Sequence, residues 1–273
     1  MLLQRVLTAL VLVPLVVAGV LLASRQGLAL VFGGFVLLGA REMARLGGLR
    51  AWPVQAGYVG VVGLCLLALY LWPDPVRDRW LQLGAICFWL PASLVLFAWR
   101  RPLEAVAGVR PLILVLGAAQ LVVAWLAVMA LHGWGGQGPA LLLFLLVLIW
   151  VADSGAYFAG RAFGRHKLSP QVSPGKTWEG AAGGLAGAVL CGLAFDRLGL
   201  APVPLLSLLG LCLLTTLVSI GGDLWESLLK RQVGLKDSGT LLPGHGGVLD
   251  RIDSLIAAAP LFALGLQWLE TPG

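Results

Sequence analysis

Nine apolar segments follow one another along the chain, each about the length of a membrane helix. They are 6–22, 28–43, 56–72, 81–98, 111–131, 140–160, 180–196, 204–224 and 254–269. Turn residues separate them, as in Pro73-Asp74-Pro75. A transmembrane helix needs about 20 mostly apolar residues. The pattern therefore predicts an all-α, polytopic integral membrane protein with about nine transmembrane helices. The first segment also fits a signal peptide, but we interpret it as a membrane helix because similar segments follow.

Composition supports a lipid-embedded chain and excludes some partners. Of the 273 residues, 59% are hydrophobic and only 12% are charged, whereas soluble domains carry about 25% charged residues. The net charge of +6 is typical of loops that face anionic lipid. No basic stretch with interleaved aromatic residues suggests a nucleic-acid surface, so we expect no nucleic-acid partner.

The distribution of Lys and Arg predicts an orientation. With alternating spans, 15 of the 19 basic residues fall on the side of the N-terminus. The opposite side holds only Arg25, Arg77, Arg79 and Arg197. Because cytoplasmic loops are enriched in Lys and Arg, the N-terminus is predicted to be cytoplasmic.

Acidic residues divide the chain into two unlike parts. The four in the first part, Glu42, Asp74, Asp78 and Glu104, all lie near segment ends. The second part holds nine, several of them inside or against apolar runs, where a charge costs roughly 2.5–3.5 kcal/mol. We therefore predict a transmembrane scaffold over 1–149 and a catalytic region over 150–273.

A first polar cluster lies at the end of the sixth apolar segment. Asp153 and Tyr157 are four residues apart and share one helix face. Asp153 is about two turns from a basic loop and is therefore placed to reach the membrane surface. The alternative is a structural ion pair between Asp153 and either Arg161 or Lys176.

A second cluster is the loop from Ser173 to Gly180. Its Gly175-Lys176-Thr177 sequence resembles the end of a P-loop, but the first glycine of that motif would fall at Pro170 and no strand precedes it. A loop of small residues that enters a helix still offers N–H groups to an anion, and Lys176 adds a positive charge. The alternative is an ordinary interfacial loop with a helix cap.

The third cluster is the richest in charge. Asp223, Glu226, Ser227 and Lys230 are spaced i, i+3, i+4 and i+7, so they form one stripe of a helix. Asp250 and Asp253 share a face of the last helix, across a glycine-rich loop. Oxygen-rich clusters without cysteine suit a hard cation such as Mg²⁺.

Basic residues accompany these acids and suit phosphate groups. They are Lys230, Arg231, Lys236, His245 and Arg251. Acids for a metal and bases for phosphate together indicate phosphoryl or nucleotidyl transfer. Two alternatives stay open, namely a loop of solvated paired charges and an ion-coupled transporter with acids at broken helices.

At this third cluster the sequence resembles the phosphatidate cytidylyltransferase (CDP-diacylglycerol synthase) family. The resemblance rests on Ser227-x-Leu229-Lys230-Arg231, Lys236-Asp237-x-Gly239 and Leu242-Pro243-x-His245-Gly246-Gly247-Val248-x-Asp250-Arg251-Ile252-Asp253. Asp153 to Tyr157 and Ser173 to Gly180 are similar to further family motifs. The likeness covers about residues 150–254, while the first half matches only as generic membrane helices.

The resemblance implies that CTP and phosphatidic acid give CDP-diacylglycerol and pyrophosphate with Mg²⁺; a second, monovalent cation is left open. It implies a bacterial plasma (inner) membrane, with membrane lipids as neighbours, an active site facing the cytoplasm, and a homodimer as an open question. A membrane transferase that uses CTP with another lipid-like acceptor, such as a polyprenol, is a further alternative.

Site residues are expected in three groups. The expected catalytic residues are Asp223, Asp250, Lys230, Arg231, His245 and Arg251. The expected substrate-binding residues are Ser173, Gly175, Lys176, Thr177, Lys236, Asp237 and Tyr157. Asp223 and Asp250 are expected to hold the metal, supported by Glu226, Asp253 and Asp153.

Overall fold

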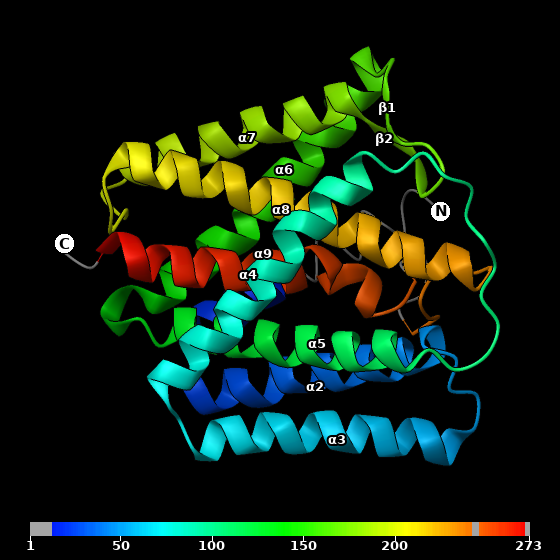
Figure 1. Cartoon of the computed structure of the whole chain (residues 1–273). Coiled ribbons are helices and arrows are strands. Elements are labelled where there is room, and N and C mark those ends of the chain that lie inside the picture. The colour runs from blue at the N-terminus through cyan, green and yellow to red at the C-terminus, as the bar shows by residue number, and fades with distance from the viewer. Residues whose placement is uncertain (1–12, 242–245, 271–273) are drawn as a thin grey trace.

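The structure is a computed structural model that describes residues 13–241 and 246–270. It is built almost entirely from helices (Figure 1). They are α2 (Arg25–Leu46), α3 (Trp52–Leu71), α4 (Pro75–Phe97), α5 (Pro111–His132), α6 (Gly138–Phe163), α7 (Trp178–Arg197), α8 (Leu205–Gln232) and α9 (Leu249–Glu270). A shorter helix, Val13–Leu22, precedes them, and the first part of predicted segment 6–22 lies outside the described residues.

The eight long helices of the described chain are each long and apolar enough to cross a membrane. Helix α3 illustrates how they meet lipid, because only Gln55, Val62 and Leu66 of its 20 residues are buried within the protein. Large apolar side chains elsewhere on α3 are exposed, which is stable only in an apolar solvent. The prediction of an all-α, polytopic integral membrane protein is confirmed.

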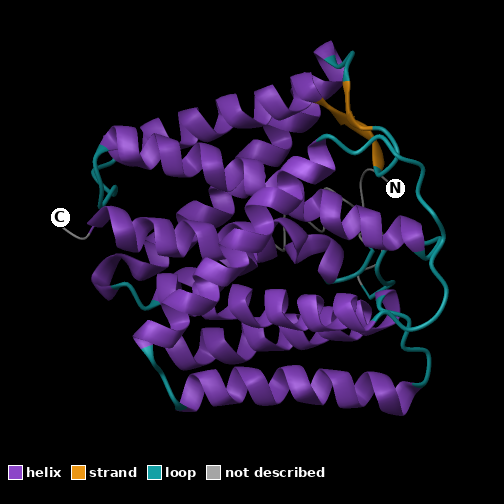
Figure 2. Ribbon diagram, in the orientation of Figure 1, coloured by secondary structure: helices purple, strands orange, loops and turns teal. Residues whose placement is uncertain are grey.

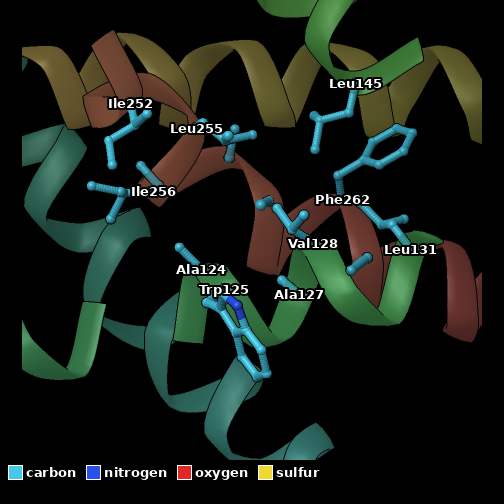
Figure 3. Packing of buried hydrophobic residues seen from close by; sticks show 14 of the residues in the cluster. Ala124, Trp125, Ala127, Val128, Leu131, Leu145, Ile252, Leu255, Ile256 and Phe262 are labelled. Atoms are coloured by element: carbon cyan, nitrogen blue, oxygen red, sulfur yellow. The ribbon is translucent and has the colours of Figure 1, made fainter. Parts of the chain in front are cut away.

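Helix α9 lies at the centre of the bundle and packs against α8, α5 and α4 (Figure 1). Its inward face interlocks with α5, where Ile256 and Phe262 lie among residues such as Ala124 and Val128 (Figure 3). Leu145 of α6 closes the same cluster. The last helix, which carries Asp250 and Asp253 near its start, is therefore held on several sides by the rest of the fold.

A small antiparallel hairpin joins α6 to α7. It consists of β1 (Lys167–Ser169) and β2 (Ser173–Thr177), with Lys167 opposite Thr177 (Figure 2). The sequence predicted only a loop here. The hairpin forms because Leu168 and Val172 are buried in a small core against α4 and α8, and Arg100 Nη1 donates to the Leu168 carbonyl at 2.8 Å.

The α2–α3, α4–α5, α6–α7 and α8–α9 connections meet at one end of the bundle, on the right in Figure 1. Arg110, just before α5, donates its backbone N–H to Gly47 O at 2.9 Å and its Nη1 to Gln232 Oε1 at 2.6 Å. Val106 N also donates to Gln232 O. These bonds tie the α2–α3, α4–α5 and α8–α9 connections together. The direction in which this end faces across the membrane stays a prediction.

Candidate active site

The hairpin delivers Lys176 to the middle of α8. Its Nζ lies 2.8 Å from Asp223 Oδ2 and 3.5 Å from the Ile220 carbonyl oxygen. Ser227 Oγ donates to the other oxygen of Asp223 at 3.3 Å. Asp153 of α6 lies within electrostatic range of both Lys176 and Asp223. The three polar clusters of the sequence, separate along the chain, therefore include residues that meet in space.

Lys230 joins α8 to α9. Its Nζ lies 2.5 Å from Asp250 Oδ1 and 3.4 Å from Glu226 Oε1. The side chains of Lys230, Glu226 and Asp250 are 11%, 3% and 6% exposed. Asp250 Oδ2 accepts from the backbone N–H groups of Ser238 and Gly247, at 3.0 and 2.7 Å. The predicted stripe on α8 thus faces the predicted carboxylates of α9.

Asp253 completes the contact between the two helices. It lies beside Glu226 and within electrostatic range of Asp223. The approach is close because Gly222 of α8 has no side chain, and a Cβ there would lie 2.7 Å from the Asp253 carbonyl oxygen. Two carboxylates of α8 and two of α9 therefore share one narrow region.

Acids outnumber bases in this region. The acidic cluster, as we call it, consists of Asp153, Lys176, Asp223, Glu226, Lys230, Asp250, Arg251 and Asp253. It holds five carboxylates against three cations, and full ionisation would leave an excess of two negative charges. That excess matches the charge of one divalent ion.

The donor set fits Mg²⁺ in chemistry, since every acid offers oxygen. Both oxygens of Glu226 are buried beside Asp253, and Lys230 Nζ lies 3.4 Å from Glu226 Oε1. Within the part of the chain that the structure describes, no three His, Cys, Asp or Glu residues are arranged to hold a metal. Metal binding by Asp223 and Asp250 would require Lys176 and Lys230 to move, so the metal assignment stays a prediction.

Some predicted substrate-binding residues already have structural partners. Thr177 Oγ1 accepts from Gly180 N at 3.0 Å and caps the N-terminus of α7, as the alternative for this loop proposed. Tyr157 is 58% exposed, and its hydroxyl accepts from Arg161 Nη1 at 3.1 Å. Ser173 is half-buried and Gly175 is exposed in the hairpin.

The predicted residues of the α8–α9 connection are spread along it. Arg231 is exposed and donates to the Leu235 carbonyl at 3.3 Å, while Lys236 and Asp237 are exposed beyond the end of α8. Arg251 is exposed and within electrostatic range of Asp153. The prediction for His245 lies outside the described residues.

Glu42 of α2 also reaches this region, which the sequence did not predict. It is 7% exposed, and its carboxylate accepts from Ser238 Oγ and from the backbone N–H groups of Val248 and Leu249 at the start of α9. A signal was present, because Glu42 shares a helix face with Gly39 and Leu46, both apolar positions. An acid on the core-facing stripe of a helix needs a partner inside the protein.

A pocket lies at the opposite end of the bundle. Its volume is about 680 Å³, and its lining includes Arg25, Arg79, Gln82 and Glu270. It contains none of the predicted site residues, so it does not belong to the acidic cluster.

Comparison with known proteins identifies the class of this membrane protein. A sequence model of the cytidylyltransferase family matches residues 3–269, nearly the whole chain. The chain therefore belongs to the cytidylyltransferase family.

Three individual relatives within this family share one name. The chain is similar to the phosphatidate cytidylyltransferase of Pseudomonas aeruginosa, with 44% identity over 270 residues that cover 98% of this chain and 97% of the relative. It is similar to that of Haemophilus influenzae, with 36% identity over 283 residues covering 96% and 98%. For the Bacillus subtilis enzyme of the same name, 45% identity extends over 123 residues, covering 45% and 46%.

Proposed function

We propose that this protein is a phosphatidate cytidylyltransferase, which transfers CMP from CTP to phosphatidic acid and releases pyrophosphate. The observation that carries the proposal is the acidic cluster, a set of paired acids and bases at one end of membrane-spanning helices. A lipid substrate arrives through the bilayer and a nucleotide through water, so a shared site must lie near the end of the spans. Full-length similarity to enzymes of that name supports the same reaction.

The reaction joins two anions. A phosphate oxygen of phosphatidic acid attacks the α-phosphorus of CTP, a new P–O bond forms, and the bond to pyrophosphate breaks with its electron pair on the leaving group. The attacking oxygen is already ionised, so no strong base is required. Lys176, Lys230 and Arg251 are placed to offset phosphate charge, and the rate enhancement comes from positioning and charge stabilisation.

Mg²⁺ fits this role as a cofactor. Asp223 and Asp250 would hold it with help from Glu226, Asp253 or Asp153, and it would screen the charge of the triphosphate. A second, monovalent cation stays an open part of the proposal.

The cytoplasmic side of a bacterial inner membrane is the proposed location of the site. Basic residues predominate at the end of the helices that carries the acidic cluster, as the positive-inside rule requires of cytoplasmic loops. The relatives above come from bacteria.

Purified protein with labelled CTP and phosphatidic acid tests the reaction. We expect label in chloroform-extractable lipid, and none after addition of EDTA. If labelled lipid forms with a polyprenol acceptor and not with phosphatidic acid, the proposed lipid substrate is wrong and the polyprenol takes its place. Ion flux in proteoliposomes without any CMP transfer would favour a transporter.

Carboxamide variants test the metal assignment. Asp223→Asn and Asp250→Asn are each expected to abolish CMP transfer while the protein remains folded. Near-wild-type turnover by either variant in saturating Mg²⁺ would refute that residue as a metal ligand. Glu104→Gln, an exposed acid at the same end of the bundle, is the matched control.

A further inference from the structure

Glu42 is a buried carboxylate, and within the part of the chain that the structure describes its side-chain hydrogen bonds lead to the α8–α9 connection and the first residue of α9. Oε2 accepts from Ser238 Oγ at 2.8 Å and from Leu249 N at 2.7 Å, and Oε1 accepts from Val248 N at 3.0 Å. These donors lie 196 to 207 residues away along the chain. Glu42 therefore ties α2 to both the beginning and the end of the segment between Ser238 and Val248.

The charge of Glu42 is balanced in an unusual way. Among the described residues, no Lys, Arg or His lies within ion-pair distance of its carboxylate. Its partners are instead a hydroxyl, the N–H of Val248 just before α9 and the N–H of Leu249, the first residue of α9, where the partial positive charge of a helix is greatest. A buried carboxylate in this position holds the N-terminus of α9 in place more firmly than a neutral cap can.

The surrounding backbone is shaped around this carboxylate. A Cβ at Gly239 or at Gly247 would collide with the carboxylate oxygens of Glu42. Both glycines lie between Ser238 and Val248, the two residues at the ends of the segment that donate to Glu42. The chain thus comes so close to Glu42 on two sides that neither position accommodates a side chain.

Ser238 connects Glu42 to Asp250. Its hydroxyl lies 2.8 Å from Glu42 Oε2 and 3.0 Å from Asp250 Oδ2, and its backbone N–H donates to Asp250 Oδ2 at 3.0 Å. Ser238 is 1% exposed, so water does not compete for these bonds. The position of the Asp250 carboxylate therefore depends on Ser238, and the position of Ser238 depends on Glu42.

We propose that Glu42 is a positioning residue for CMP transfer, which holds the start of α9 and, through Ser238, orients the Asp250 carboxylate in the active site. The proposal rests on the proposed function, because Asp250 is the group it positions. It assigns a role in the reaction to a residue of the N-terminal half. Glu42 itself touches neither substrate, since its oxygens are already occupied by groups of the protein.

The test compares Glu42→Gln with the control Glu104→Gln, which makes the same chemical change at an exposed position at the same end of the bundle. An amide keeps the shape of Glu42 but places NH₂ against an N–H or O–H donor. Amide hydrogen exchange in detergent is measured over residues 246–252. We expect exchange at Val248 and Leu249 to accelerate about tenfold or more in Glu42→Gln and to stay unchanged in Glu104→Gln.

Kinetics distinguish positioning from a purely structural role. In Glu42→Gln we expect kcat to fall about tenfold to hundredfold, with the apparent KM for CTP changed less than about threefold and the melting temperature well above the assay temperature. If the wild-type protein transfers CMP and Glu42→Gln has the same kcat, the proposal is overturned. A fall in kcat with unchanged exchange at Val248 and Leu249 also overturns it, because the effect would not pass through α9.

Ser238→Ala keeps the test decisive if Glu42→Gln does not fold. It removes only the hydroxyl between Glu42 and Asp250, so kcat should fall as it does in Glu42→Gln. A kcat equal to that of the wild type would overturn the proposed link to Asp250. Where both single variants fold, the double variant should lose no more than the larger single effect, because they act in series. If the wild type transfers no CMP to lipid, the proposed function fails, and hydrogen exchange alone then decides whether Glu42 holds α9.

Discussion

Lys230 offers the sharpest test of how the acidic cluster is held together. Its ammonium group lies between Asp250 and Glu226, at 2.5 and 3.4 Å, and all three side chains are nearly covered by protein. Lys230→Met keeps the length of the side chain and removes the charge. Two buried carboxylates then lose their shared counter-ion.

The expected cost follows from that geometry. Removal of one partner from a buried ion pair typically destabilises a protein by about 3–5 kcal/mol, because the other charge stays desolvated. We expect Lys230→Met to lower the free energy of unfolding by at least about 3 kcal/mol. Lys167→Met, an exposed lysine on β1, should change it by less than about 0.5 kcal/mol.

Reversible unfolding in mixed detergent micelles measures these free energies. Adding Asp250→Asn to Lys230→Met should recover at least about 1 kcal/mol, because one of the stranded charges is then gone. A Lys230→Met protein as stable as Lys167→Met would refute the idea that this lysine stabilises the cluster. Strict additivity of the two substitutions would refute their direct coupling.

Two further predictions concern the hairpin and the α6–α7 contact. Lys176→Ala should raise the apparent KM for CTP because it removes a cation 2.8 Å from Asp223. Lys167→Ala, on the same hairpin, should leave the KM unchanged, and the same KM in both variants would leave Lys176 with a structural role only. Gly183→Ala should lower the free energy of unfolding by about 1–3 kcal/mol, because the added Cβ would lie 2.7 Å from Gly155 O. A Cβ added at Gly210 on α8 would meet no atom within 4 Å, so Gly210→Ala should leave the free energy of unfolding unchanged. Equal stability of the two variants would contradict the close packing of α6 and α7.

The membrane-spanning helices were predictable because the apolar residues that lipid requires lie within each helix's own sequence. Each must carry about 20 apolar residues whatever its neighbours are. Predicted segment 111–131 corresponds to α5 at Pro111–His132, and 140–160 to α6 at Gly138–Phe163. The helices continue past the predicted ends of the apolar segments where polar residues follow, as α8 does beyond Leu224 to Gln232, because hydropathy alone cannot detect a polar helical turn.

The stripe on α8 was predictable for a similar reason. Asp223, Glu226 and Lys230 are close in sequence, and helix geometry alone places them on one face. Their partners were not predictable in the same way. The ion pair of Lys176 with Asp223 depends on a hairpin that forms because Leu168 and Val172 are buried against α4 and α8, and that contact is tertiary.

Glu42 marks where reasoning from composition is least informative. An acid near the end of an apolar segment is typical of a membrane interface, so the four acids of residues 1–149 suggested a scaffold. The position of Glu42 on an apolar helix face is a signal in the sequence, but the packing of α2 beside the start of α9 is what shows its partners. Glu104, by contrast, is exposed in a loop at the same end. The division into a scaffold over 1–149 and a catalytic region over 150–273 stays a prediction. It does not follow that the first half is inert, because a helix supplied by that half holds the residue on which Asp250 depends.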